Sequence, residues 1–338
     1  MTNMSVALFA LVSAIAPAQD PAVAPPQQQK KPAPIYDEQA AAKAVVASAV
    51  ERAKKENRRV LVQWGANWCG WCHRLHDLCR SDKDLAKELL YEYDVVLVDV
   101  GRFDKNVDLA TGYGAKLKET GIPYLTVLDG DGKVLANQDT GGFESGDKTK
   151  PGHDPKKVLE FLKSHRAQPA KARELLDAAL ASAKPDGRRV FVHFGAPWCG
   201  WCHKLENWMA SAEIAPILAK EFVEVKIDTD RSTGGSDMLA AMRAKAAEKA
   251  GRAPKDGGIP WFVFLDAQGE MLADSDGPEG NTGFPSQPAE IDHFVAMLKK
   301  SCTKLTSGDI ELLKNSLTAV REKAEREQAE RAKAEKKS

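Results

Sequence analysis

Two short segments of the chain have residue types and spacing that could support chemistry, and together they contain four of its six cysteines. They are Trp68-Cys69-Gly70-Trp71-Cys72-His73 and Trp198-Cys199-Gly200-Trp201-Cys202-His203. Two thiols at this spacing can cycle between dithiol and disulfide, or can bind zinc together with further ligands. When a histidine follows directly, the same spacing can also attach haem. The elements around the cysteines must decide among these chemistries.

Each cysteine pair lies between an expected strand and an expected helix. The apolar runs 60–64 and 190–194 end at a Gly-Ala pair and predict buried strands, and a stretch of helical character follows each CxxC. Unpaired N–H groups and the positive end of the helix dipole stabilise a thiolate at a helix start. We therefore expect Cys69 and Cys199 to be the nucleophiles, and Cys72 and Cys202 to resolve the mixed disulfide.

This repeated context resembles the thioredoxin superfamily, and most closely its extracytoplasmic branch with Cys-Gly-Trp-Cys followed by His or Lys. A second similarity is the Gly-Ile-Pro at 121–123 and 258–260, each before another apolar strand. Thioredoxin-like folds have a cis-proline there that faces the CxxC, so the resemblance implies that Pro123 and Pro260 are cis. It also implies that these prolines, with Ile122 and Ile259, contact substrates, and that redox-active disulfides act without a further cofactor.

Other interpretations of the motif remain open. A c-type haem electron carrier would use Cys-x-x-Cys-His, but the strand before each motif and the Gly-Ile-Pro after it favour redox chemistry. Zinc could use Cys69, Cys72 and His76, although the second copy has Glu206 at the place of His76. A purely structural disulfide would close too short a loop to stabilise the chain much. A non-catalytic docking module with a thioredoxin fold is the remaining alternative.

The tryptophans of the motifs have two expected environments. Trp71 and Trp201 lie between the cysteines, so we expect them to reach solvent, where they either offer a flat apolar contact to protein substrates or pack locally. Trp68 and Trp198 are expected to support the turn from the core.

Polar residues near each pair are expected to tune its reactivity. Protonated His73 and His203 would favour the thiolate, or else these histidines simply face solvent. Thioredoxins keep a buried aspartate six residues before the first cysteine, and this chain has Gln63 and His193 there instead. Because glutamine cannot titrate and histidine can, we expect the two sites to differ in pH dependence.

Of the remaining two cysteines, Cys79 is expected to be an inert thiol. Cys79 lies seven residues after Cys72, roughly 10 Å along a helix axis, which is beyond disulfide reach. Met209 holds the equivalent place in the second copy, which indicates a buried apolar position. A bridge between Cys79 and Cys302 is the alternative for an exported protein.

The start of the chain predicts export. An apolar stretch from Val6 to Ala16 precedes Ala16-Pro17-Ala18, a pattern suited to signal peptidase, and a Pro/Gln-rich segment follows. We therefore expect an exported, periplasmic or otherwise extracytoplasmic protein without stable membrane insertion after cleavage. The expected organisation is signal peptide 1–18, linker 19–34, first domain 35–166, second domain 167–303 and a charged, solvated helical tail 304–338.

The fold class is predicted to be α/β, with two tandem thioredoxin folds in which helices flank a mixed sheet. Each copy has the order β-α-β-α-β-β-α, with 95–100 and 222–227 expected as buried central strands. Hairpins are expected at 129–132 and 266–269. Net charge is zero, with 48 residues of each sign, which offers no basis for nucleic-acid binding. We therefore expect a thiol–disulfide oxidoreductase acting on protein dithiols and disulfides with an upstream redox partner.

Overall fold

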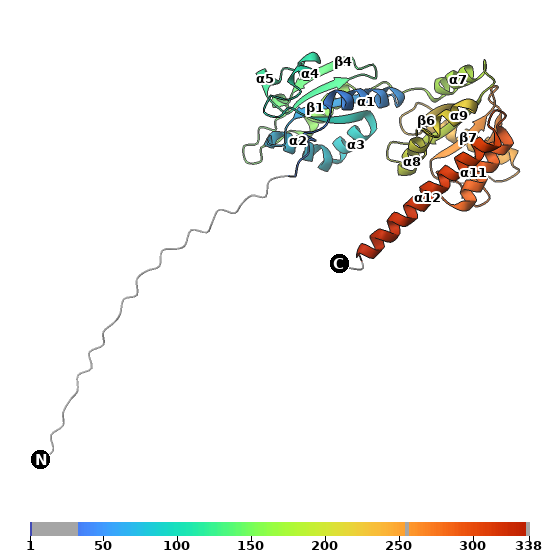
Figure 1. Ribbon diagram of the computed structural model, residues 1–338. Helices are drawn as coiled ribbons and strands as arrows, with labels where there is room; N and C mark the ends of the chain where they lie inside the picture. The colour runs from blue at the N-terminus through green and yellow to red at the C-terminus, as the bar shows by residue number, and fades with distance from the viewer. Residues whose placement is uncertain (2–32, 254–256, 336–338) are drawn as a thin grey trace. The chain divides into compact units, whose positions relative to one another are not determined.

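The structure is a computed structural model, which describes Met1 and residues 33–253 and 257–335 (Figure 1). Apart from Met1, the expected signal peptide, residues 1–18, lies outside the described residues, as does most of the expected linker 19–34. Residues from Ile35 onward form one compact unit that contains both copies of the motif.

The first domain is built on a four-stranded mixed sheet in the order β2-β1-β3-β4. Strand β1 runs parallel to β2 and antiparallel to β3, and β3 forms the expected hairpin with β4. Figure 1 shows helices lying along this sheet. The elements are α1 (Ala42–Lys55), β1 (Arg59–Gly65), α2 (Gly70–Ser81), α3 (Lys83–Glu92), β2 (Tyr93–Asp99), α4 (Val107–Gly112), α5 (Leu117–Thr120), β3 (Tyr124–Leu128), β4 (Val134–Asp139), a 3-10 turn η1 (Gly141–Phe143) and α6 (Pro155–Ser164).

The second domain repeats this topology with the strand order β6-β5-β7-β8. Between the CxxC and the proline it has one long helix, α10, where the first domain has the short α4 and α5. The elements are α7 (Ala172–Ala183), β5 (Arg189–Gly195), α8 (Gly200–Met209), α9 (Ala215–Glu221), β6 (Phe222–Asp228), α10 (Gly235–Lys249), β7 (Trp261–Leu265), β8 (Met271–Asp274), β9 (Asp276–Gly277), β10 (Gly280–Asn281), α11 (Pro288–Ser301) and α12 (Ser307–Glu335). The predicted α/β class with two thioredoxin-like sheets is confirmed.

One prediction about the sheets was wrong. The runs 95–100 and 222–227 form edge strands, and the central positions belong to β1 with β3 and to β5 with β7. Val96 and Val98 pack into the core beneath α1, whereas Val95 is 40% exposed. A continuous apolar run can therefore occupy an edge, since helices that cover the sheet bury it even where one side lacks a neighbouring strand.

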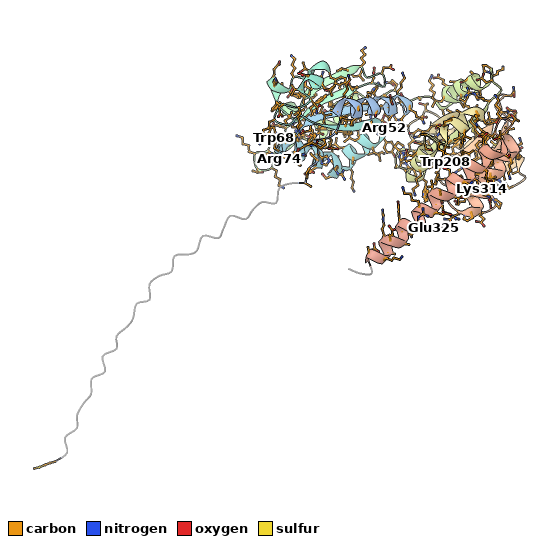
Figure 2. All side chains as sticks on the ribbon, viewed as in Figure 1. Arg52, Trp68, Arg74, Trp208, Lys314 and Glu325 are labelled. Carbon is orange, nitrogen blue, oxygen red and sulfur yellow. A yellow bond between two sulfur atoms is a disulfide. The ribbon has the colours of Figure 1, made fainter. Side chains whose placement is uncertain are left out.

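The charged C-terminal segment also differs from the solvated tail that we expected. The first turns of α12 bury Ile310, Leu313 and Leu317 in the core of the second domain. Residues 322–335 are exposed, and Figure 2 shows Glu325 on this outer part of the helix. The prediction of a solvated tail relied on the charged composition of the whole segment and overlooked these three apolar residues at helical spacing. None of the helices in the described part of the chain is long and apolar enough to cross a membrane.

Candidate functional site

Each cysteine pair forms a disulfide at the start of a helix. Cys69 caps α2 and Cys199 caps α8, and in each pair the Cα atoms lie 5.2 Å apart. The backbone N–H of the second cysteine donates to the Sγ of the first at 3.1 Å in both sites. An N–H donor at a helix start favours negative charge on the sulfur that caps it. We call these two disulfides, with their surroundings, the first site and the second site.

The two Gly-Ile-Pro segments lie against the capping cysteines. The peptide bonds Ile122–Pro123 and Ile259–Pro260 are both cis, as the resemblance implied. Cys69 Sγ lies 3.7 Å from the Ile122 carbonyl oxygen, and Cys199 Sγ lies 3.4 Å from that of Ile259. In each site, the expected nucleophile therefore lies beside the backbone that is expected to bind substrate.

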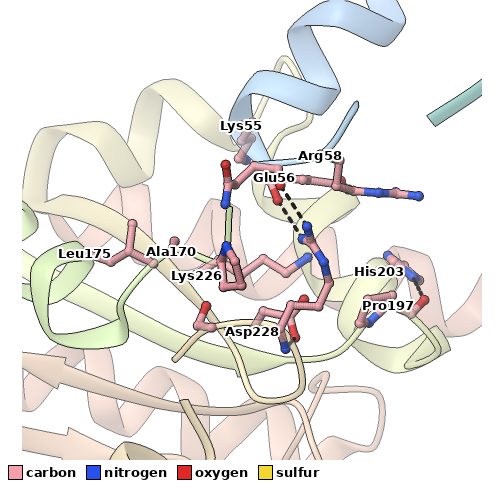
Figure 3. Close-up of a pocket in the computed structure, with 13 residues that line it drawn as sticks. Lys55, Glu56, Arg58, Ala170, Leu175, Pro197, His203, Lys226 and Asp228 are labelled. Carbon is pink, nitrogen blue, oxygen red and sulfur yellow. Dashed lines mark hydrogen bonds and ion pairs between the residues drawn. The ribbon is translucent and has the colours of Figure 1, made fainter. Parts of the chain in front are cut away.

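The histidines that follow the pairs hold the turn before the helix. His73 Nε2 lies 2.9 Å from the Asn67 carbonyl oxygen, and His203 Nε2 lies 2.8 Å from that of Pro197. Since a carbonyl only accepts, each ring must donate an N–H to the residue two positions before the first cysteine. Figure 3 shows the His203–Pro197 contact. The histidines thus position the capping cysteines.

The four tryptophans of the motifs lie on or near the surface. Trp201 is 50% exposed beside Phe284 and the Lys204 ammonium, while Trp71 is partly buried against His153 and Arg74. The expectation that Trp68 and Trp198 support the turn from the core was wrong, because they are 51% and 57% exposed. Each donates its indole N–H to an oxygen outside the motif, which holds the ring over the surface. Figure 2 shows Trp68 and Arg74 at the same end of the first domain.

In the first site, a tyrosine distant in sequence lies behind the second cysteine. Tyr36 is 2% exposed, and its hydroxyl accepts a hydrogen bond from Gln63 Nε2 at 2.8 Å. A Cβ added to Gly65 would lie 2.1 Å from Tyr36 Oη and 2.9 Å from Cys72 Sγ, so these two atoms lie no more than 5.0 Å apart. Gly65 thus allows the hydroxyl to approach the disulfide. Burial raises the pKa of Tyr36 far above its usual value, so the hydroxyl stays neutral.

Asn67 holds the segment that brings Tyr36 into the first site. Its side-chain oxygen accepts from the backbone N–H groups of Ile35 and Tyr36, both at 2.9 Å. Its amide nitrogen donates to the Tyr36 carbonyl oxygen at 3.0 Å and to Glu38 Oε1 at 2.8 Å. The second copy has Pro197 at this place, and proline has no side-chain hydrogen-bonding group.

Charged residues lie behind the second cysteine of the second site. A Cβ added to Gly195 would lie 3.2 Å from Cys202 Sγ and 3.7 Å from Glu206 Oε1, so a carboxylate lies within 6.9 Å of the sulfur. Lys226 Nζ pairs with the same carboxylate oxygen at 2.7 Å. Figure 3 shows His203 and Lys226 lining one pocket, to which Lys55 and Glu56 also contribute.

His193, the residue expected to act as a base in the second site, makes a hydrogen bond with the carboxylate of Glu224. It is 1% exposed, and its Nε2 lies 3.1 Å from Glu224 Oε1. Burial acts to raise the pKa of Glu224, but the hydrogen bond from His193 and the charge of Lys55 lower it to about 2. That His193 serves as a base for the second site stays a prediction.

Sequence reasoning missed three groups beside the disulfides. Glu206 could have been found, because it lies one helical turn after Cys202. Tyr36 and Lys226 are too distant along the chain for any spacing rule to place them.

The other two cysteines are free, so the alternative bridge between Cys79 and Cys302 does not form. Burial raises the pKa of both thiols to about 12, which for Cys79 accords with the expectation of an inert thiol. Among the described residues, no group of three or more His, Cys, Asp or Glu could hold a metal ion.

Family models match both halves of the chain. Residues 46–149 match a thioredoxin-like domain, and residues 156–321 match Thioredox_DsbH, a family described as a protein of unknown function, DUF255. Together with the two repeated sheets, these matches define the class: the chain belongs to the thioredoxin-like proteins and carries two such domains in tandem.

Curated relatives are named for disulfide chemistry. Protein disulfide-isomerase tigA of Aspergillus niger is 27% identical over 189 residues, which cover 53% of this chain and 47% of the relative. Disulfide bond reductase DsbH of Chlamydia pneumoniae is 28% identical over 109 residues, covering 30% of this chain and 61% of the relative. The chain thus spans about half the length of the first of these relatives. A solved disulphide isomerase of Xylella fastidiosa is 30% identical, with 38% of this chain and 95% of that chain covered and a TM-score of 0.34.

Proposed function

We propose that this protein is a thiol–disulfide oxidoreductase that exchanges disulfides with protein substrates through both sites. One observation carries the proposal: in each site a helix-capping sulfur receives a backbone N–H at 3.1 Å and lies beside the carbonyl oxygen that precedes a cis-proline. This arrangement stabilises a thiolate next to a backbone edge on which an extended peptide can lie. The names of the curated relatives support the same chemistry.

In the reducing direction, the thiolate of Cys69 or Cys199 attacks a substrate disulfide. The substrate S–S bond breaks, one substrate sulfur leaves as a thiolate and takes a proton, and a mixed disulfide forms. The thiolate of Cys72 or Cys202 then attacks the capping sulfur and releases the second substrate thiolate. The site becomes a disulfide, which a dithiol of an upstream redox partner must reduce; the reverse sequence oxidises a substrate.

The test is reduction of insulin disulfides by the chain from residue 35 onward, with dithiothreitol as the electron source. Cys69→Ser, Cys199→Ser and the double variant are compared with the parent protein. We expect each single variant to keep part of the activity and the double variant to lose it. Cys79→Ser is the matched control, because this partly buried thiol belongs to neither site.

The other outcomes are equally informative. Unchanged activity in the double variant would overturn the assignment of the nucleophiles. Inactivity of the parent protein toward insulin would favour a docking module, and a haem absorption band in the visible spectrum of the purified protein would favour the electron carrier.

We also propose that the protein acts after export, in the periplasm or another extracytoplasmic compartment. The support is the apolar stretch 6–16 followed by Ala-Pro-Ala. Cell fractionation of the full chain with a C-terminal tag, together with N-terminal sequencing of the mature protein, tests this proposal. An uncleaved protein in the cytoplasmic fraction would contradict it.

A further inference from the structure

We propose that the Tyr36 hydroxyl donates a hydrogen bond to the Cys72 sulfur when the first-site disulfide opens, and that the second site works without such a donor. The inference rests on the proposed function, since it concerns the same disulfide exchange. It assigns a role to a residue outside the CxxC and Gly-Ile-Pro segments, and it makes the two sites chemically unequal.

The first step of the argument is distance. Tyr36 Oη and Cys72 Sγ lie no more than 5.0 Å apart, because both are close to the place that a Cβ at position 65 would occupy. The Tyr36 ring packs with Cys69 and Cys72 in one buried cluster, to which Ile35 and Leu97 add apolar contacts. The neighbours of the hydroxyl thus include an amide and a sulfur in a buried and mainly apolar setting, in which the carboxylate of Asp99 is the charged group that acts on the hydroxyl. A hydrogen bond in such a setting is stronger than in water.

The second step is the direction of the hydrogen bonds. Gln63 donates its N–H to Tyr36 Oη, so the hydroxyl's own proton is not used in that contact. Burial raises the pKa of Tyr36, which keeps this proton in place throughout the working pH range. Tyr36 is therefore a neutral donor whose oxygen already accepts a hydrogen bond from Gln63.

The third step is the motion that disulfide opening requires. When an incoming thiolate attacks Cys69 Sγ, the Cys69–Cys72 bond breaks and its electron pair leaves on Cys72 Sγ as a thiolate. Non-bonded heavy atoms rest about 3.5–4.0 Å apart, so Cys72 Sγ must move away from Cys69 Sγ. Movement toward Tyr36 would bring it within hydrogen-bond distance of the hydroxyl. A donor there stabilises the leaving thiolate, and a more stable leaving group departs faster.

The segment is also held firmly enough for this role. The four hydrogen bonds of Asn67 attach residues 35–38 to the turn that precedes Cys69. The second domain has no tyrosine that could act in the same way, because all five tyrosines of the chain lie between positions 36 and 124.

The experiment compares Tyr36→Phe with its parent in the chain from residue 35 onward, with Cys199 and Cys202 replaced by serine so that only the first site reports. Two quantities are measured: the rate at which dithiothreitol reduces the Cys69–Cys72 disulfide, and the equilibrium constant of that reaction. Since a hydrogen bond to a charged group is lost, we expect both to fall about tenfold, which for the equilibrium is about 30 mV. Unchanged values in a folded variant would overturn the inference.

Tyr93→Phe is the matched control. Tyr93 is as buried as Tyr36, but its hydroxyl donates to the Leu162 carbonyl oxygen, away from the disulfide. This variant should lose stability without changing the reduction equilibrium. An equal shift in both variants would mean that the effect of Tyr36 is structural. Neither measurement needs a protein substrate, so failure of the inference is distinct from failure of the insulin test.

A second measurement needs no substitution of Tyr36. In protein labelled with ¹³C at tyrosine Cζ, reduction of the first site should shift the Tyr36 resonance, because the acceptor of its hydroxyl changes. Reduction of the second site, in protein that lacks Cys69 and Cys72, should leave that resonance unmoved. A Tyr36 resonance that stays constant on reduction of the first site would overturn the inference even if Tyr36→Phe failed to fold.

Discussion

The two sites are alike where they face substrate backbone and unlike behind the second cysteine. Both present a helix-capping sulfur, a histidine that holds the turn and a carbonyl oxygen before a cis-proline. Behind Cys72 lie the neutral Tyr36 hydroxyl and the Gln63 amide. Behind Cys202 lies the ion pair of Glu206 and Lys226.

This difference shows that a repeated motif does not imply a repeated function. The geometry in front of the sulfurs comes from the motif itself, whereas the stability of a thiolate also depends on groups behind it. A charge several ångströms away in a partly buried setting changes the free energy of a thiolate by on the order of 1 kcal/mol, which is comparable with the effect of the helix start. We therefore expect the two sites to differ in redox potential and in pH dependence.

The largest expected difference concerns acid. His153 lies beside Trp71 of the first site, whereas Phe284 lies beside Trp201 of the second site. Burial, with the positive charge of Arg74, lowers the pKa of His153 to about 4. His153 therefore binds its proton more tightly in the unfolded chain than in the folded one. Its contribution to the free energy of unfolding is full above about pH 6.5 and is lost as the pH falls toward 4. The loss is about 2–3 kcal/mol of unfolding free energy.

Hydrogen exchange of peptides from each domain, measured at pH 7.5 and 4.5, checks this prediction. We expect opening of the first domain to become easier at low pH, and His153→Phe to reduce that sensitivity. The reciprocal Phe284→His variant should transfer acid sensitivity to the second domain. Equal acid responses of wild type and His153→Phe would contradict the assignment.

The next effect concerns the residue two positions before each capping cysteine. Asn67→Ala removes the hydrogen bonds that attach residues 35–38, so we expect a loss of about 1–3 kcal/mol and slower reduction of the first site. Denaturant unfolding and reduction by dithiothreitol measure the two consequences. Pro197→Ala is the matched change, and it should leave reduction of the second site nearly unaltered. Equal effects of both changes would show that the Asn67 contacts have no special role.

The smallest effect tests the ion pair of the second site. Glu206→Gln leaves the Lys226 ammonium without its carboxylate near Cys202, which favours the thiolate there. We expect the pH midpoint for alkylation of the reduced second site to move down by about one unit. Lys226→Met should move it up, and His76→Gln at the equivalent place of the first site should change nothing. A midpoint unaffected by both Glu206→Gln and Lys226→Met would exclude a role for the pair.

Much of the site could be predicted because it depends on neighbours in sequence. The CxxC at a helix start, the Gly-Ile-Pro before a strand and the hairpin after it are local patterns, and the resemblance implied the cis-prolines correctly. The environments of Trp68 and Trp198 were predicted wrongly, because an aromatic residue beside a turn can pack inward or lie outside with equal local geometry. The apolar run at 95–100 likewise does not say whether a strand is central or at an edge.

By itself, the sequence determined the class of the protein, its two redox motifs and the order of elements in each domain. These follow from periodicity and from hydrogen bonds between residues a few positions apart. Only the tertiary structure placed Tyr36 behind Cys72 and the Glu206–Lys226 pair behind Cys202. The reason is that such contacts join residues twenty or more positions apart, and the packing of a helix or segment onto a sheet decides which side chains meet.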